Sequence, residues 1–186
     1  MRLFLTTILL CFSLALANPF DFSDKGGGEI SGDVLALALP AFAGIYTLSQ
    51  SDYEGTGQLA LSYSTALATV LILKYAIPRP RPYADDLENP SGDDLNSFPS
   101  GHTASAFSAS SFMWRRYGWK LGVPTTALAT YVGVTRMTSD NHHLTDVLAS
   151  VAISVGTTFI FTKNQKLEMF PILGTKTYGV MVKGKF

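Results

Sequence analysis

Long uncharged segments alternate with short polar ones along most of this chain. Five segments carry no charged side chain: Val34–Ser51, Gly55–Leu73, Thr103–Trp114, Leu121–Thr135 and Val147–Thr162. Each is longer than an ordinary strand, and alanine and leucine outnumber β-branched residues in most of them, which favours helices. Glycine and proline gather mostly between the segments, where they end helices. The pattern predicts an all-α fold, a helical bundle of five to six helices.

Hydropathy alone does not decide whether this bundle spans a membrane, because several segments fall near or below the about 17 residues that a span needs. The basic residues favour a span. If the chain enters the membrane at its N-terminus and alternates, the basic stretches "MWRRYGWK" and "TKNQK" lie on the cytoplasmic side, as the positive-inside rule requires. The same topology gathers five polar residues on the outer face: Lys74, Arg81, His102, Arg136 and His142. We expect a membrane-embedded bundle with its active site at one end. A soluble periplasmic helical domain is the alternative.

Both ends of the chain differ from this helical part. Residues 1–17 combine one basic residue, an apolar run and a plausible cleavage site before Asn18, as in a signal peptide. An uncleaved first transmembrane helix is the alternative, and either way the chain from Asn18 onward emerges outside the cytoplasm. Residues 18–172 would form the helical domain, and the alternating residues 173–186 predict a short C-terminal strand or tail. The only cysteine, Cys11, lies in the leading segment, so the exported part has no disulfide.

The balance of charge narrows the possible partners. Fourteen basic and fourteen acidic side chains cancel, and no basic run is present, which argues against nucleic acid. Several of the scarce basic residues instead gather near the histidines, which predicts a local anion site.

Two clusters of polar residues border the apolar segments in the middle of the chain. In "KYAIPRPRP", Lys74 ends a helix, and the prolines hold Arg81 on a stiff, extended arm. In "SFPSGHTASAF", Ser100 or Thr103 can cap the helix that follows. The orphan N–H groups of such a helix start, together with the positive end of its dipole, bind anions. His102 stands beside this site.

The third cluster, "TRMTSDNHHLTD", holds two adjacent histidines. We expect a helix to begin near Asn141–His142, which places His142 and Asp146 on one face. The carboxylate could then accept the imidazole Nδ1–H and leave Nε2 as a nucleophile. His143 lies three residues before Asp146 and could meet it as well, so the geometry alone leaves the choice open.

A metal site is a weaker interpretation of the same residues. His142, His143, Asp140 and Asp146 are all ligand types, but adjacent histidines point in different directions from a helix. The nearby lysine and arginine would also repel a cation. They fit a phosphoryl group better, because cations neutralise its oxygens while one histidine attacks and the other protonates the leaving oxygen. We expect neither a metal nor a cofactor.

In order and spacing, the three clusters resemble the signature of the type 2 phosphatidic acid phosphatase family, which shares its site with bacterial acid phosphatases and vanadium haloperoxidases. Lys74 is followed after six residues by Arg81-Pro82, residues 99–102 read Pro-Ser-Gly-His, and the third block is Arg136, five residues, His142, three residues, Asp146. The resemblance implies His142 as a nucleophile that forms a phosphohistidine, Asp146 as its orienting partner, and His102 as general acid and then base. It implies that five residues hold the phosphate oxygens: Lys74, Arg81, Ser100, Gly101 and Arg136.

Some residues depart from this signature or lie outside it. Thr135 replaces the usual serine before the arginine, Asn141 and His143 flank the nucleophile, and Asp140 adds negative charge nearby. We expect these changes to affect substrate choice and pH response more than the reaction. Arg79 is most simply a second solvated or headgroup-contacting cation. The acidic stretch "YADDLENPSGDD" is either a solvated loop or a rim that selects among headgroups.

The resemblance implies a phosphatase that hydrolyses a phosphomonoester or pyrophosphate of a membrane lipid. Polyprenyl pyrophosphate, phosphatidate, phosphatidylglycerol phosphate and lipid A phosphates are all candidates. The enzyme would lie in the bacterial inner membrane with its site facing the periplasm. A soluble periplasmic acid phosphatase is the alternative, and a non-catalytic membrane binding protein is a third possibility, which the intact His102, His142 and Asp146 disfavour.

Overall fold

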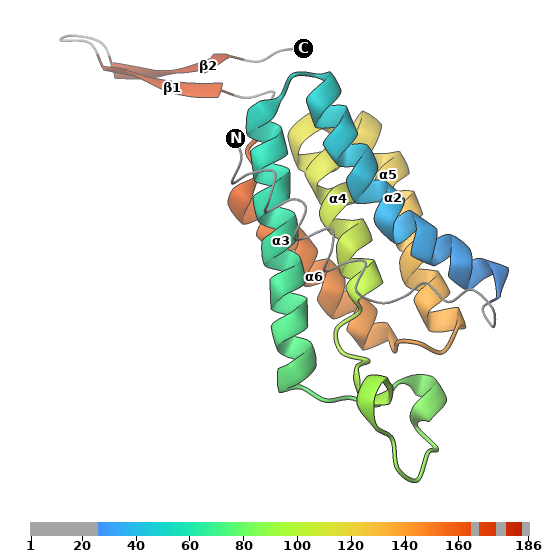
Figure 1. Ribbon diagram of the computed structural model, residues 1–186. Coiled ribbons are helices and arrows are strands. Elements are labelled where there is room, and N and C mark those ends of the chain that lie inside the picture. Colours follow the sequence, from blue (N-terminus) through green and yellow to red (C-terminus); the bar gives the residue numbers. More distant parts are fainter. Residues whose placement is uncertain (1–25, 165–167, 174–177, 184–186) are drawn as a thin grey trace.

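The computed structural model describes residues 26–164, 168–173 and 178–183, and its main body is a bundle of α-helices (Figure 1). Five α-helices lie in the described part: α2 (Gly27–Ser49), α3 (Tyr53–Ala76), α4 (Gly101–Tyr117), α5 (Trp119–Thr138) and α6 (Leu144–Phe161). Two short 3-10 helices, η1 (Pro82–Ala84) and η2 (Gly92–Leu95), lie in the connection between α3 and α4. The predicted all-α bundle is therefore confirmed, and each uncharged segment forms most of one helix.

Helix α4 forms the centre of the bundle and contacts each of the other four helices. Its alanines and serines are small enough to let neighbouring backbones approach, and Phe112 and Met113 fill the middle of the core with no exposed surface. Hydroxyl groups also join the helices. Ser105 donates to the carbonyl of Ala36 in α2 at 2.6 Å, and Ser154 of α6 donates to the carbonyl of Ala104 at 2.9 Å.

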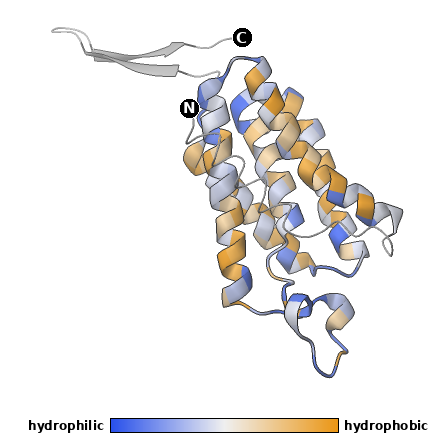
Figure 2. Ribbon diagram, viewed as in Figure 1, coloured by the Kyte–Doolittle hydropathy of each residue, from blue (hydrophilic) through white to orange (hydrophobic). Residues whose placement is uncertain are grey.

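The outer surface of the bundle suits a lipid environment. Three of the described helices, α2, α3 and α6, are long and apolar enough to cross a membrane. Large apolar side chains point outward from them, including Ile45, Ile72 and Ile160, which are 68%, 67% and 74% exposed. Figure 2 shows hydrophobic residues over long stretches of the helices, and mainly hydrophilic ones in the α3–α4 connection. These features confirm the predicted membrane-embedded bundle and favour it over a soluble domain.

A buried ion pair holds one end of the bundle together. Asp52 is the N-cap of α3. Its carboxylate accepts from Nε of Arg116 at 2.9 Å and from the NH2 group of the same arginine at 2.6 Å, and it also accepts from the Tyr117 hydroxyl at 2.7 Å. Burial alone would raise the pKa of Asp52. Hydrogen bonds from Arg116, Tyr117 and the N–H of Gly55 outweigh it and lower the pKa to about 2. Arg116 also donates to the carbonyl of Lys163 at 3.3 Å, so this network ties the end of α6 to α3 and α4.

The C-terminal part forms two strands. β1 (Glu168–Leu173) pairs antiparallel with β2 (Tyr178–Lys183), with Glu168 opposite Lys183. The sequence predicted a single short strand or tail within residues 173–186 and placed the preceding residues in the helical domain. Pro171 lies inside β1, and a proline argues against a strand when only the sequence is considered. The predicted signal peptide or first helix, residues 1–17, falls outside the described residues.

Candidate active site

The three polar clusters meet at the end of the bundle opposite the Asp52–Arg116 pair. Lys74 lies in the last turn of α3, Ser100 caps the start of α4, and Arg136 lies in the last turn of α5. Asp146 lies in the first turn of α6. Because successive helices run in alternating directions, residues far apart in sequence reach one end of the fold. The predicted site at one end of the bundle thus has a structural basis.

The nucleophile candidate His142 lies in a loop and not on a helix, which corrects the expected helix start. Helix α6 begins at Leu144, and its N-cap is His143. The chain before it folds back onto the end of α5, since the N–H groups of Asn141 and His142 both donate to the carbonyl of Arg136 at 3.1 Å. Asp146 accepts from the N–H of His143 at 2.9 Å, as an acidic residue at this helix position commonly does.

The side chain of His142 is held mainly by Ser97. Its Nδ1 lies 2.6 Å from the carbonyl oxygen of Ser97, whereas the nearest oxygen of Asp146 is 3.9 Å away, beyond hydrogen-bond range. The Ser97 hydroxyl donates to Asp146 at 2.6 Å, so the carboxylate acts on His142 through this serine. Because a carbonyl only accepts, Nδ1 carries the proton and Nε2 keeps its lone pair. Sequence reasoning gave no signal for Ser97.

The surroundings of His142 keep its ring neutral. Burial, followed by the nearby positive charges of Lys74 and Arg81, lowers the pKa of His142 to about 2, against the opposing effect of the hydrogen bond with Ser97. The whole residue is only 4% exposed. A neutral imidazole with a free Nε2 lone pair beside two cations is the form that can attack an electrophilic phosphorus.

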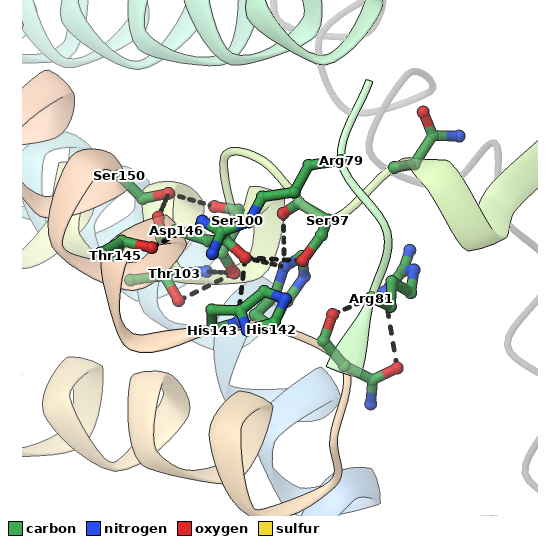
Figure 3. A network of polar contacts seen from close by, with 12 residues as sticks. Arg79, Arg81, Ser97, Ser100, Thr103, His142, His143, Thr145, Asp146 and Ser150 are labelled. Carbon is green, nitrogen blue, oxygen red and sulfur yellow. Dashed lines mark hydrogen bonds and ion pairs between the residues drawn. The ribbon is translucent and has the colours of Figure 1, made fainter. Parts of the chain in front are cut away.

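Asp146 is the centre of a polar network that Figure 3 shows from close by. Its buried carboxylate accepts from Arg79 at 2.6 Å, from Ser97 and from the N–H of His143. Arg79 also donates to the Thr145 hydroxyl at 2.6 Å. The sequence analysis treated Arg79 as a solvated or headgroup-contacting cation and did not predict this ion pair, in which the Arg79 side chain is 35% exposed. Its place between two prolines, beside Arg81, was the available signal, but the sequence does not show which arginine pairs with Asp146.

The start of α4 is built as the sequence predicted. The Ser100 hydroxyl accepts from the N–H of Thr103 at 3.4 Å and from its hydroxyl at 2.9 Å. Ser150 of α6 donates to the carbonyl of Ser100 at 2.8 Å and to that of Asp146 at 2.8 Å. These contacts fix the helix N-terminus, with the N–H groups near Gly101 and His102, against the loop that carries His142.

Two predicted phosphate-binding cations interact with the α3–α4 connection. Lys74 donates to the carbonyl of Asn96. Arg81 pairs with the carboxylate of Asp93 at 2.9 Å and donates through Nε to the Asp93 carbonyl at 3.0 Å. The acidic loop is therefore not merely solvated, because its Asp93 carboxylate forms an ion pair with Arg81, a predicted phosphate-binding residue. Arg81 also lies 3.4 Å from the carbonyl of Asn141, next to His142.

Helix α2 contributes residues to the site that the sequence did not predict. Asp33 lies 2.6 Å from NH1 of Arg136 and 3.3 Å from Nε2 of His102. The NH2 group of Arg136 donates to the carbonyl of Glu29 at 2.8 Å. The three clusters carry no signal for these contacts, because α2 precedes all of them in the chain.

Comparison with known proteins assigns the chain to a family. A profile of the PAP2 superfamily matches residues 55–169. The chain belongs to the PAP2 superfamily. The family predicted from the three motifs is thereby confirmed.

Two relatives of this chain have names that refer to the same lipid. The lipid A 4'-phosphatase of Helicobacter pylori (strain J99) is 31% identical over 163 residues, which covers 82% of each chain. The lipid A 1-phosphatase of Porphyromonas gingivalis is 33% identical over 69 residues, 36% of this chain and 16% of that protein. The crystal structure of Aquifex aeolicus LpxE superposes with a TM-score of 0.54 at 21% identity, covering 68% of this chain and 82% of that one. This last likeness supports the fold.

In this PAP2 chain, every predicted site residue lies at one end of the helical bundle, on four helices and the loops between them. No group of three histidine, cysteine, aspartate or glutamate side chains within the described part of the chain is arranged to hold a metal ion. The residues missed from the sequence are Arg79, Ser97 and Asp33, each of which contacts a motif residue.

Proposed function

We propose that this protein is a phosphatase that removes a phosphate group from a lipid A-type membrane lipid through a phosphohistidine on His142. The observation that carries the proposal is the neutral, buried imidazole of His142 next to Lys74, Arg81 and the N-terminus of α4. This combination offers a nucleophile, two cations and backbone N–H donors to one phosphoryl group.

The proposed reaction has two steps. In the first, Nε2 of His142 attacks phosphorus and forms a P–N bond, while the bond from phosphorus to the leaving oxygen breaks and His102 gives that oxygen a proton. In the second step, His102 takes a proton from a water molecule. The oxygen of that water attacks phosphorus, the P–N bond to His142 breaks, and phosphate is released. Lys74, Arg81 and Arg136 would neutralise the oxygens of the transferred group, and no step needs a metal ion.

Two observations support a lipid substrate in the membrane. The site lies at the end of helices that are apolar enough to span a bilayer, at the level where a lipid phosphate would meet it. The relative that matches 82% of this chain is named a lipid A 4'-phosphatase. Several basic residues, including Arg115, Arg116 and Lys163, belong to the opposite end of the bundle, which supports a cytoplasmic location for that end and a periplasmic one for the site.

The proposal is tested by phosphate release from purified protein in detergent with excess EDTA. The substrates are bis-phosphorylated lipid A, phosphatidate, undecaprenyl pyrophosphate and p-nitrophenyl phosphate, and tandem mass spectrometry locates the phosphate lost from lipid A. We expect turnover of lipid A at one position, unaffected by EDTA and abolished in His142→Ala. Preference for another lipid would keep the mechanism and reject the substrate. Activity that needs a divalent metal, or that survives His142→Ala, would reject the mechanism.

A further inference from the structure

Asp33 is a buried carboxylate in a helix that otherwise suits the membrane. It lies about two turns into α2, a candidate membrane span, and has no exposed surface. The family profile begins at residue 55, so α2 lies before the matched region. An acidic side chain in an apolar span is costly, and such residues usually serve a function within the bundle.

The contacts of Asp33 are with two predicted site residues on two other helices. Its Oδ1 lies 2.6 Å from NH1 of Arg136 on α5 and 3.3 Å from Nε2 of His102 on α4. A single carboxylate oxygen thus lies between the candidate general acid and a candidate phosphate ligand. The contacts are ion pairs at these distances and not aligned hydrogen bonds, and charges attract strongly in the interior of a bundle, so this carboxylate can hold both side chains by charge.

The backbone of α2 is held close to α5 at this level. A Cβ atom at Gly32 would collide with the Thr135 side chain, so only glycine allows the approach. The carbonyl of Glu29 accepts from Arg136 at 2.8 Å, and its carboxylate accepts from Asn141 at 3.0 Å. The first turns of α2 therefore contact both the end of α5 and the loop that carries His142.

We propose that Asp33 is a positioning residue for the proposed phosphatase reaction, holding His102 ready to protonate the leaving oxygen and Arg136 ready to hold a phosphate oxygen. The inference rests on the proposed function and adds to it a residue outside the three motifs. Asp33 acts through these two side chains and does not itself touch the substrate.

The geometry gives each contact a chemical consequence. Nε2 of His102 lies 3.3 Å from Asp33, and the carboxylate stabilises the protonated ring that a general acid requires. NH1 and NH2 of Arg136 are held by α2. Its Nε is buried and has no hydrogen-bond partner among the described residues, which leaves this donor for a phosphate oxygen.

The way in which the loss of kcat depends on the leaving group distinguishes a positioning role of Asp33 from a merely structural one. A general acid matters most when the leaving oxygen is a poor leaving group, as in an alkyl or sugar phosphate, and little when it is a nitrophenolate. In Asp33→Asn, we expect kcat on bis-phosphorylated lipid A to fall about 100-fold and kcat on p-nitrophenyl phosphate by less than about 10-fold. His102→Ala should show the same uneven loss, and Asp33→Asn should add little to it on lipid A.

The contact between Asp33 and Arg136 can be tested by vanadate binding, without measuring turnover. Vanadate, a mimic of the phosphoryl centre, should raise the unfolding temperature of the wild type, and Asp33→Ala should weaken this vanadate affinity about 10-fold. Ser31→Ala is the matched control. It removes a 2.7 Å contact between α2 and Tyr131 of α5 on the exposed side of the same helix, and should leave both readouts unchanged.

The outcomes distinguish this inference from the proposed function. An equal loss on both substrates in Asp33→Asn, with unchanged vanadate affinity, would overturn the positioning role and leave only a structural one. Wild-type rates and vanadate affinity in both Asp33 variants would overturn the inference as well. An active His142→Ala protein would instead reject the proposed phosphohistidine. If these Asp33 variants do not fold, Asp33→Glu keeps the charge but moves it by one methylene, and it should lower kcat on lipid A more than kcat on p-nitrophenyl phosphate; an equal loss on both substrates would overturn the positioning role.

Discussion

Arg79 donates a 2.6 Å hydrogen bond to the carboxylate of Asp146, although the two residues are 67 positions apart. The contact joins the proline-rich arm after α3 to the first turn of α6, where Asp146 also binds Ser97, the residue that holds His142. The family signature contains Asp146 but not Arg79, so this partner is a feature of the fold that the motif alone does not give.

Replacement of Arg79 by alanine should impair catalysis and stability together. It removes one charged partner of a buried carboxylate, which costs about 1–3 kcal/mol of unfolding free energy. It should also lower kcat by about 10-fold, because Asp146 and Ser97 would no longer hold His142 firmly. Arg79→Lys should recover part of both losses. Wild-type kcat and unfolding midpoint in Arg79→Ala would show that Asp146 does not need this partner.

The two adjacent histidines should differ sharply in a matched pair of variants. His142→Ala should abolish turnover, since the nucleophile is lost. His143→Ala should keep most of it, because this residue caps α6 through its backbone and its Nε2 lies 3.2 Å from the carbonyl of Pro80. The measurement is phosphate release, with acid-quenched labelling by ³²P-substrate to detect the phosphohistidine. Equal loss in the two variants would contradict the assignment of His142.

Release of Arg81 from the acidic loop should strengthen phosphate binding. Asp93 occupies the guanidinium at 2.9 Å and must give way when a phosphate oxygen approaches. Asp93→Asn should therefore lower KM and the vanadate inhibition constant by up to about 5-fold with little change in kcat, as expected for an exposed ion pair worth up to about 1 kcal/mol. Asp86→Asn, in the same loop, is the control. An increase in KM would show that Asp93 helps to place Arg81.

Stability should fall with acidity because of His142. The unfolded histidine has a pKa of 6.5 and the folded one a pKa of about 2. Between these values the unfolded chain binds a proton that the folded chain does not, so stability is full above pH 6.5 and decreases as the pH falls. From pH 7 to pH 5 the loss is about 2 kcal/mol. Denaturant unfolding in detergent should show a shallower pH dependence in His142→Asn, and parallel curves would contradict the low pKa.

The ion pair at the other end of the bundle should matter for stability alone. Arg116→Ala leaves the buried Asp52 unpaired and should cost about 3–5 kcal/mol, with kcat preserved at temperatures where the variant is folded. Arg115→Ala is the neighbouring control. Arg115 is only partly buried and stacks 4.7 Å from the ring of Phe159, so its loss should cost about 1 kcal/mol or less. A similar cost for both variants would mean that burial of the Asp52 pair adds nothing.

The site residues could be predicted from the sequence only where both their spacing and their chemistry fit a known pattern. Uncharged segments between breakers predict the helices, and three short motifs predict the residues that meet at their ends. The start of α6 could not be predicted, because it depends on a loop that folds back onto the carbonyl of Arg136. Ser97 and Asp33 could not be predicted either. Each acts through a contact with a distant segment, and a single serine or aspartate has no periodicity to mark it.

The small, hydroxyl-bearing residues of α4 have a consequence for how the protein enters the bilayer. Alone in lipid, a helix of this composition gains little from insertion, and among the described helices α4 is not one of those long and apolar enough to span. Its neighbours must therefore shelter it as they insert. Because Ser100 caps α4 and His102 lies in its first turn, we expect the candidate site to form only once α4 is packed among its neighbours.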